Sequence, residues 1–149
     1  MNRRSMIAMA GMAGFAWVPA ARAEDATPTV VSQNESIARE YIERVWSQGD
    51  ASAIDTLIAE NYLPPNASDA PGREAFRARW ETGWGALKSA LPDLRYSVEV
   101  AIGSGDFVSL RGAISGTTTS GDAIRTWYLS MLEIHDGRIT TEWALVNRG

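Results

Sequence analysis

The spacing of apolar residues divides the chain into a first half with helical periodicity and a second half with the alternation typical of β-strands. Helical spacing occurs in three segments, at residues 33–48, 51–58 and 73–90. From residue 94 onward, apolar residues alternate with polar or small ones, which predicts four strands at residues 94–102, 108–114, 123–135 and 138–146. Three helices followed by an antiparallel meander predict an α+β domain, with the helices packed on one face of a curved sheet.

Capping and turn residues indicate where some of these elements begin and end. Ser32 and Glu35 have the spacing of a capping box at the start of the first helix. Asp50 can cap the second helix with its carboxylate. Asp136-Gly137 is typical of a two-residue hairpin turn and separates the last two predicted strands.

The first 23 residues have the pattern of an export signal peptide. Two arginines precede an apolar run at residues 6–18, which is too short to span a bilayer, and Ala21-Arg22-Ala23 fits a cleavage site. The start resembles a twin-arginine signal, although a general secretory signal can also begin with two arginines. We therefore expect a periplasmic or secreted protein with a signal at 1–23, a flexible lead-in at 24–32 and one domain at 33–149. An uncleaved membrane anchor is the alternative, and the short apolar run disfavours it.

Charge and composition exclude several classes of function. Without residues 1–23 the chain has 126 residues, with 11 basic and 18 acidic side chains and a net charge of −7. Such a domain repels phosphate backbones and anionic membranes, so we expect no nucleic-acid partner and no membrane association after signal cleavage. The chain has no cysteine, and its only histidine, His135, precedes a predicted turn, where an exposed role is expected. We accordingly predict no metal site and no cofactor.

Three stretches follow one another along the chain: PGREAFRARW with the following LPDLRYSVE, then SGTTTSG, then EIHDGRITTEWAL. In this order they resemble a SnoaL-like polyketide cyclase domain of the nuclear transport factor 2-like superfamily. The resemblance covers about residues 36–146 and implies a cone-like sheet wrapped by helices, with an apolar pocket between them. It also implies a polyketide or ester cyclase-like activity, in which an aspartate and nearby histidines act as acid and base.

The histidines and the aspartate of the family pattern are replaced by other residues in this chain. The Glu-His-Trp-Asp pattern of the family's last strand falls on Thr141 to Ala144, so Glu142 takes the histidine position and Ala144 the aspartate position. Pro65 and Thr118 replace two further histidines of the family pattern. The resemblance therefore supports a pocket more than it supports polyketide cyclisation, because a fold does not confer the chemistry of its relatives.

Glu142 is the candidate catalytic residue. A simple alternation from the Asp136-Gly137 turn pairs Glu142 with Met131, on a face that Trp127 shares. A carboxylate among such apolar neighbours is expected to have a raised pKa and to act as a general base. The alternatives are a solvated glutamate on the open side of the sheet, or one neutralised by an arginine such as Arg125 or Arg138.

Five further residues are candidates for ligand binding. Trp80 and Trp84 belong to an aromatic stripe of the third helix, which either packs in the core or also forms a pocket wall. Trp127 and Met131 share the predicted face of Glu142. Asn66 lies in a predicted loop, where it either binds a ligand or forms a turn.

These residues predict an exported domain that binds a small hydrophobic molecule. If it is an enzyme, we expect cofactor-free acid/base chemistry of the cyclase, isomerase or hydratase kind, with Glu142 as the base. The alternative is a non-catalytic binding or assembly module on the same fold.

We also expect a homodimer through the sheet, because three helices can cover only one of its faces. Alternation along the last two strands predicts that their large apolar residues divide between the two faces. One face carries Trp127, Leu129 and Met131, and the other carries Leu132, Ile134, Ile139, Trp143 and Leu145. Trp143 is the expected centre of the interface, because tryptophan is enriched at interface hot spots.

Overall fold

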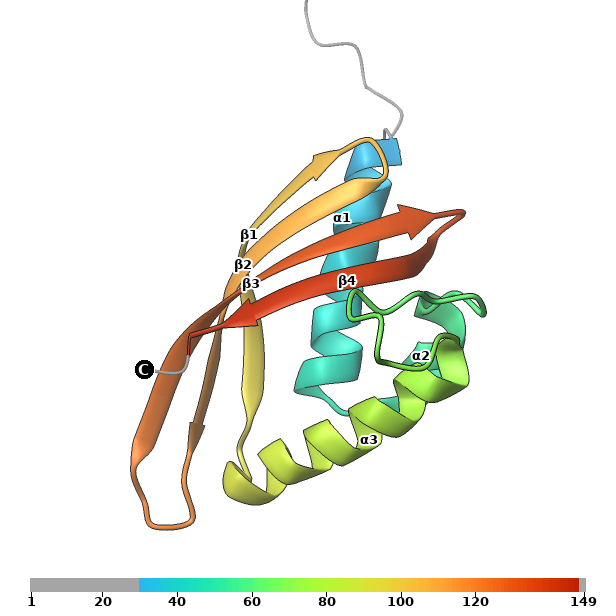
Figure 1. Cartoon of the computed structure of the whole chain (residues 1–149). Coiled ribbons are helices and arrows are strands. Elements are labelled where there is room, and N and C mark those ends of the chain that lie inside the picture. Colours follow the sequence, from blue (N-terminus) through green and yellow to red (C-terminus); the bar gives the residue numbers. More distant parts are fainter. Residues whose placement is uncertain (1–29, 148–149) are drawn as a thin grey trace, which may run out of the picture.

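The computed structural model describes residues 30–147, which form an α+β domain (Figure 1). The helical part comprises α1 (Val30–Tyr41), the π-helical turn η1 (Ile42–Ser47), α2 (Ala51–Leu57) and α3 (Arg73–Ala90). The strands are β1 (Arg95–Ser104), β2 (Phe107–Thr117), β3 (Ala123–His135) and β4 (Arg138–Val146). The predicted α+β fold is confirmed, while the predicted export signal lies outside the described residues.

Of the two predicted helix caps, the one at Asp50 forms and the capping box at Ser32 and Glu35 does not. Asp50 caps α2 as expected, because its carboxylate accepts the Ser52 backbone N–H at 3.0 Å. However, α1 begins at Val30, within the predicted lead-in, and Glu35 does not complete a capping box. The Glu35 carboxylate instead accepts the backbone N–H of Gly103 at 2.8 Å, which ties α1 to the β1–β2 hairpin.

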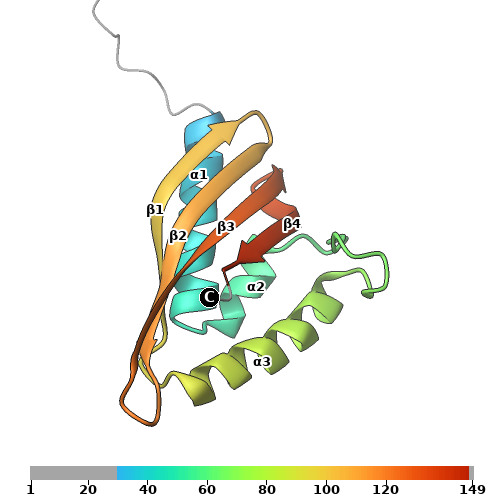
Figure 2. The same ribbon diagram turned by 60° about the vertical axis from the view of Figure 1, so that its left-hand side comes forward.

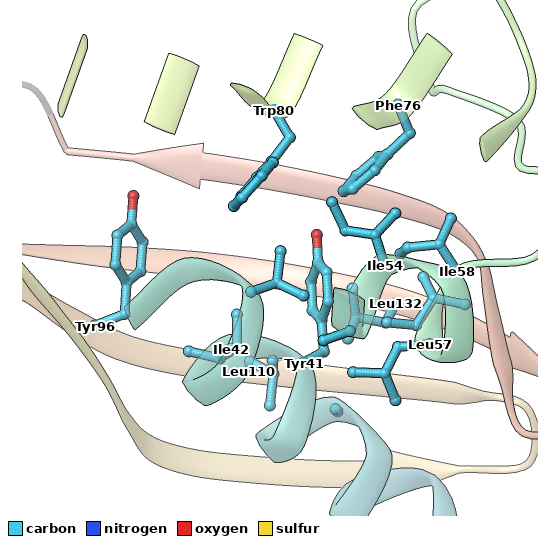
Figure 3. Packing of buried hydrophobic residues seen from close by; sticks show 14 of the residues in the cluster. Tyr41, Ile42, Ile54, Leu57, Ile58, Phe76, Trp80, Tyr96, Leu110 and Leu132 are labelled. Atoms are coloured by element: carbon cyan, nitrogen blue, oxygen red, sulfur yellow. The ribbon is translucent and has the colours of Figure 1, made fainter. Parts of the chain in front are cut away.

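The four strands form one antiparallel sheet in the order β1-β2-β3-β4. The sheet curves, and the helices lie on its concave side in both views (Figures 1 and 2). Apolar side chains from α1, η1, α2, α3 and the sheet meet in one core between these layers (Figure 3). None of the helices within residues 30–147 is long and apolar enough to cross a membrane.

The β3–β4 hairpin contains an irregularity that the simple alternation missed. Asp136 and Gly137 form the predicted turn, with φ angles of 50° and 75°. Ile134 then pairs with Ile139, and Glu133 pairs with Thr141, so Thr140 has no partner residue and forms a β-bulge. Beyond the bulge every pair is shifted by one residue, and Glu142 lies opposite Leu132. The predicted pairing of Glu142 with Met131 is therefore wrong.

The bulge also decides which side chains of β4 face the helices. Ile139 and Glu142 face the helical layer together, although they are three residues apart, because the extra residue between them reverses the alternation. Trp143 and Leu145 therefore point to the other side, where they pair with Met131 and Leu129. Five large apolar residues that β3 and β4 place on this uncovered side are named here the outer face. They are Trp127, Leu129, Met131, Trp143 and Leu145, and all are exposed. The prediction that put Trp143 and Leu145 on the face of Leu132, Ile134 and Ile139 is wrong.

Candidate active site

Glu142 is held in place by two hydroxyl groups from other elements. The Tyr41 hydroxyl at the end of α1 donates a hydrogen bond to Glu142 Oε2 at 2.5 Å, and Ser130 Oγ on β3 donates to Oε1 at 2.7 Å. Burial of the carboxyl raises the pKa of Glu142, and the two donated hydrogen bonds offset part of that rise. Glu142 as a whole residue is half-buried, and it lines a cavity.

The cavity beside Glu142 has a volume of about 80 Å³ and walls that are mostly apolar. It lies between η1 and the concave side of the sheet. Its walls are formed by Ile42, Trp46, Tyr96, Tyr128, Glu142, Ala144 and Val146. Because Glu142 is the only ionisable carboxyl group among these lining residues, the site can offer one proton acceptor to an apolar guest.

All four tyrosines of the chain lie within electrostatic reach of Glu142. Burial and the negative charge of Glu142 raise the pKa of each, and the pKa of Tyr96 rises to about 12. These phenols therefore stay protonated at neutral pH, and each retains an O–H that can donate a hydrogen bond.

Gly112 on β2 makes room for one of these tyrosines. A Cβ atom at position 112 would overlap the Ser97 carbonyl oxygen and the ring of Tyr128. The Tyr128 ring crosses β2 at this point, and its hydroxyl donates to the Ser97 carbonyl at 3.2 Å. Glycine at this position thus allows a cavity-lining ring to approach the backbone of β2 closely.

The alternatives of a solvated or arginine-neutralised Glu142 do not fit the geometry. Its carboxylate is enclosed by Tyr41 and Ser130. Arg138 donates to the carbonyl oxygen of Asp55 at 2.7 Å, and Arg125 forms an ion pair with Glu99 at 2.9 Å. Neither guanidinium is a partner of Glu142.

The two predicted tryptophans of α3 support the cavity without lining it. Trp80 is buried in the core and stacks on Trp84, with ring centroids 5.6 Å apart. The Trp84 indole N–H donates to the Trp46 carbonyl at 3.0 Å, which fixes the backbone of a cavity-lining residue. The Trp80 indole N–H is buried and has no acceptor within residues 30–147.

The other predicted ligand-binding residues lie away from Glu142. Asn66 is exposed, and its side-chain oxygen accepts the Ser68 backbone N–H at 3.2 Å, as in a turn. Trp127 and Met131 belong to the outer face, so the sheet separates them from the cavity. The bulge at Thr140 is the reason, because it turns Glu142 away from the face that these two residues occupy.

Sequence reasoning missed the residues that surround Glu142. Nothing in the local sequence marks Tyr41, Trp46, Tyr96 or Tyr128 as site residues. Ser130 gave no signal that distinguished it from other strand serines. Their shared property is proximity in the folded chain, and no local motif encodes it. Within residues 30–147 no cluster of His, Cys, Asp and Glu side chains has an arrangement that could hold a metal ion.

We expect Tyr41→Phe to destabilise the domain in a pH-dependent way. The variant removes a hydrogen bond to a buried carboxylate, which is worth about 1.5–3 kcal/mol when the acceptor is charged. The pKa of Glu142 should rise further, since this bond favours the ionised form. Urea unfolding at acid and neutral pH measures the loss, which should be larger at neutral pH.

Tyr128→Phe is the matched control for this substitution. Its hydroxyl bonds to an uncharged carbonyl oxygen, so its cost should not depend on the ionisation of Glu142. A Tyr41→Phe loss that is equal at both pH values would contradict the charged pairing of Tyr41 with Glu142.

Solved structures of several bacterial proteins share this fold. A proposed polyketide cyclase from Bacillus cereus ATCC 10987 superimposes with a TM-score of 0.67 at 20% identity, covering 78% of this chain and 75% of that one. A proposed polyketide cyclase from Acidithiobacillus ferrooxidans gives 0.66 at 21% identity, covering 80% and 92%. IdmH, a proposed polyketide cyclase from Streptomyces antibioticus, gives 0.63 at 24% identity, covering 77% and 92%. At these identities the likeness shows the fold alone.

The sequence itself carries the family relationship. No curated protein sequence matches the chain significantly. The model of the SnoaL-like polyketide cyclase family matches residues 36–148, which include all four strands and the residues around Glu142. The chain therefore belongs to the SnoaL-like polyketide cyclase family.

Proposed function

We propose that the protein is a cofactor-free acid/base catalyst that acts on a small, largely hydrophobic molecule, with Glu142 as its base. The observation that carries this proposal is the position of the Glu142 carboxylate, which is buried, held by two hydroxyls and placed at the wall of an apolar cavity. A small-molecule role agrees with the family, whereas the cyclase, isomerase or hydratase chemistry is part of the proposal.

The electrostatics of the site favour proton transfer. A general base works best when its pKa approaches the working pH, and burial moves the pKa of Glu142 in that direction. Tyr41 and Ser130 each use one carboxylate oxygen, and each oxygen retains a second lone pair that can accept a proton from a guest. Glu142 thus replaces, with a different side chain, the histidine that the family pattern has at this position.

A benzisoxazole tests the proposed base without knowledge of the natural substrate. A base removes the ring C–H proton, the C–H electron pair forms the nitrile, and the N–O bond breaks to give a cyanophenolate. The wild-type protein should accelerate this ring opening, with a rate that rises with pH as Glu142 ionises. A non-catalytic binding module on the same fold would bind the probe and leave its rate at the buffer level.

We further propose that the protein is exported and that residues 1–23 are removed. The paired arginines, the short apolar run and Ala21-Arg22-Ala23 support this proposal. Intact-mass analysis of the protein expressed in a bacterium and recovered from its periplasm should give a chain that begins at Glu24. A recovered chain that still begins at Met1 would contradict cleavage.

A further inference from the structure

One hydroxyl group that lines the cavity forms no hydrogen bond with the part of the chain that the structure describes. The Tyr41 hydroxyl donates to Glu142, and the Tyr128 hydroxyl donates to Ser97. Tyr96 also lines the cavity, but its hydroxyl forms no hydrogen bond with any residue in the range 30–147. A donor of this kind at a cavity wall is available to a guest.

The ring and the backbone of Tyr96 are held by neighbouring residues, although its hydroxyl has no hydrogen-bond partner within residues 30–147. The Tyr96 ring packs against the rings of Trp46 and Tyr128, each with a centroid 5.7 Å from that of Tyr96. The Tyr96 backbone N–H donates to Ser47 Oγ at 3.2 Å, which fixes the start of β1 against η1. Figure 3 shows the hydroxyl ends of Tyr96 and Tyr41 pointing to the same side, toward α3. The donor is therefore pre-positioned on the side where Tyr41 meets the carboxylate of Glu142.

We propose that Tyr96 is a substrate-binding residue whose hydroxyl donates to an uncharged carbonyl oxygen, and that it selects neutral ketones over carboxylates. This inference rests on the proposed function of Glu142. The selectivity follows from the pair of groups, because Tyr96 offers a hydrogen-bond donor while the nearby Glu142 carboxylate repels an anion. The apolar walls add a preference for a compact hydrocarbon skeleton.

The two groups together can catalyse enolisation. Glu142 accepts a proton from the carbon next to the carbonyl, and the C–H electron pair forms the new C=C bond. The carbonyl π electrons move to oxygen, where the Tyr96 hydroxyl stabilises the developing negative charge. Return of a proton from Glu142 to the same carbon or to another completes an exchange or an isomerisation, and no other reactant is needed.

Cyclohexanone labelled with ¹³C at the carbonyl is a direct probe of Tyr96. We expect its bound carbonyl stretch to lie at lower frequency in the wild-type protein than in Tyr96→Phe, since a donated hydrogen bond weakens the C=O bond. Its affinity should fall about two- to tenfold in the variant, as expected for one neutral hydrogen bond. The anion cyclohexanecarboxylate should bind the wild-type protein more weakly than the ketone does.

Two further variants separate this proposal from that of Glu142. Tyr128→Phe removes a lining hydroxyl already bonded to Ser97, so it should leave the carbonyl frequency low. Glu142→Gln should stop deuterium exchange at the carbon next to the carbonyl, while the bound frequency stays low. An equal carbonyl frequency in wild type and Tyr96→Phe would overturn the role of Tyr96. So would failure of the wild-type protein to bind the ketone, or an equal frequency change in Tyr128→Phe.

Discussion

Glu142→Gln is expected to slow the opening of a benzisoxazole ring by about 10²–10⁴-fold, the contribution typical of a positioned general base. Glutamine has nearly the same shape and can still bond to Tyr41 and Ser130, but it cannot accept a proton at neutral pH. Binding of the probe should therefore change far less than its turnover.

The same variant should change the pH dependence of stability. The pKa of Glu142 is raised in the folded protein, so between its ordinary value near 4.5 and the raised value the folded chain binds more protons than the unfolded chain. The free energy of unfolding therefore falls as pH rises through this window. Glu142→Gln removes that fall, and at neutral pH we expect it to be as stable as the wild type or more stable.

Glu133→Gln is the matched control, because it makes the same change on the neighbouring strand. Glu133 is absent from the cavity walls, and its carboxylate contacts His135 at 2.9 Å near the hairpin turn. We expect Glu133→Gln to keep the ring-opening rate. Equal rates for wild type and Glu142→Gln would show that Glu142 is not the base.

Trp143→Ala is expected to weaken a homodimer by at least ~2 kcal/mol, about 30-fold in dissociation constant. We propose that two copies pair through the outer face. Its five apolar side chains are exposed. They belong to the side of the sheet that the helices leave open (Figure 2), and Trp143 pairs with Met131 on that side. A two-fold partner can bury the same patch on both copies.

Sedimentation at micromolar concentration measures this effect. Leu63→Ala is the control, since Leu63 is exposed in the loop before α3 and lies outside the outer face. We expect a wild-type dimer, a weakened Trp143→Ala dimer and an unchanged Leu63→Ala dimer. A monomeric wild-type domain would contradict the proposed dimer, and an unweakened Trp143→Ala dimer would contradict its interface.

Most of the fold could be predicted because its signals are local. The change from helical spacing to alternation marks the boundary between α3 and β1, Asp50 caps α2, and Asp136-Gly137 forms the turn between β3 and β4. Each of these features depends on residues that are neighbours in sequence. Local rules therefore suffice to place the elements.

The face on which Glu142 lies depends on the bulge residue Thr140, which local sequence rules do not predict. Without the bulge at Thr140, one face of β4 would carry Ile139, Thr141, Trp143 and Leu145, and Glu142 would lie on the opposite face. The bulge lets Ile139 and Glu142 both face the helices. Tertiary packing, and not the local sequence, decides where this bulge forms. The partnership of Tyr41 with Glu142 spans 101 residues, and no sequence motif indicates it.

Titration of the Glu142 side chain by ¹³C NMR tests the central claim most directly. Comparison of wild type with Glu142→Gln assigns the carboxyl signal, and its chemical shift is then followed against pH. A buried carboxylate at the wall of an apolar cavity should titrate above its ordinary pKa of about 4.5, and higher still in Tyr41→Phe. A Glu142 pKa at or below the ordinary value, with no response to Tyr41→Phe, would contradict the account of Glu142 as a buried base.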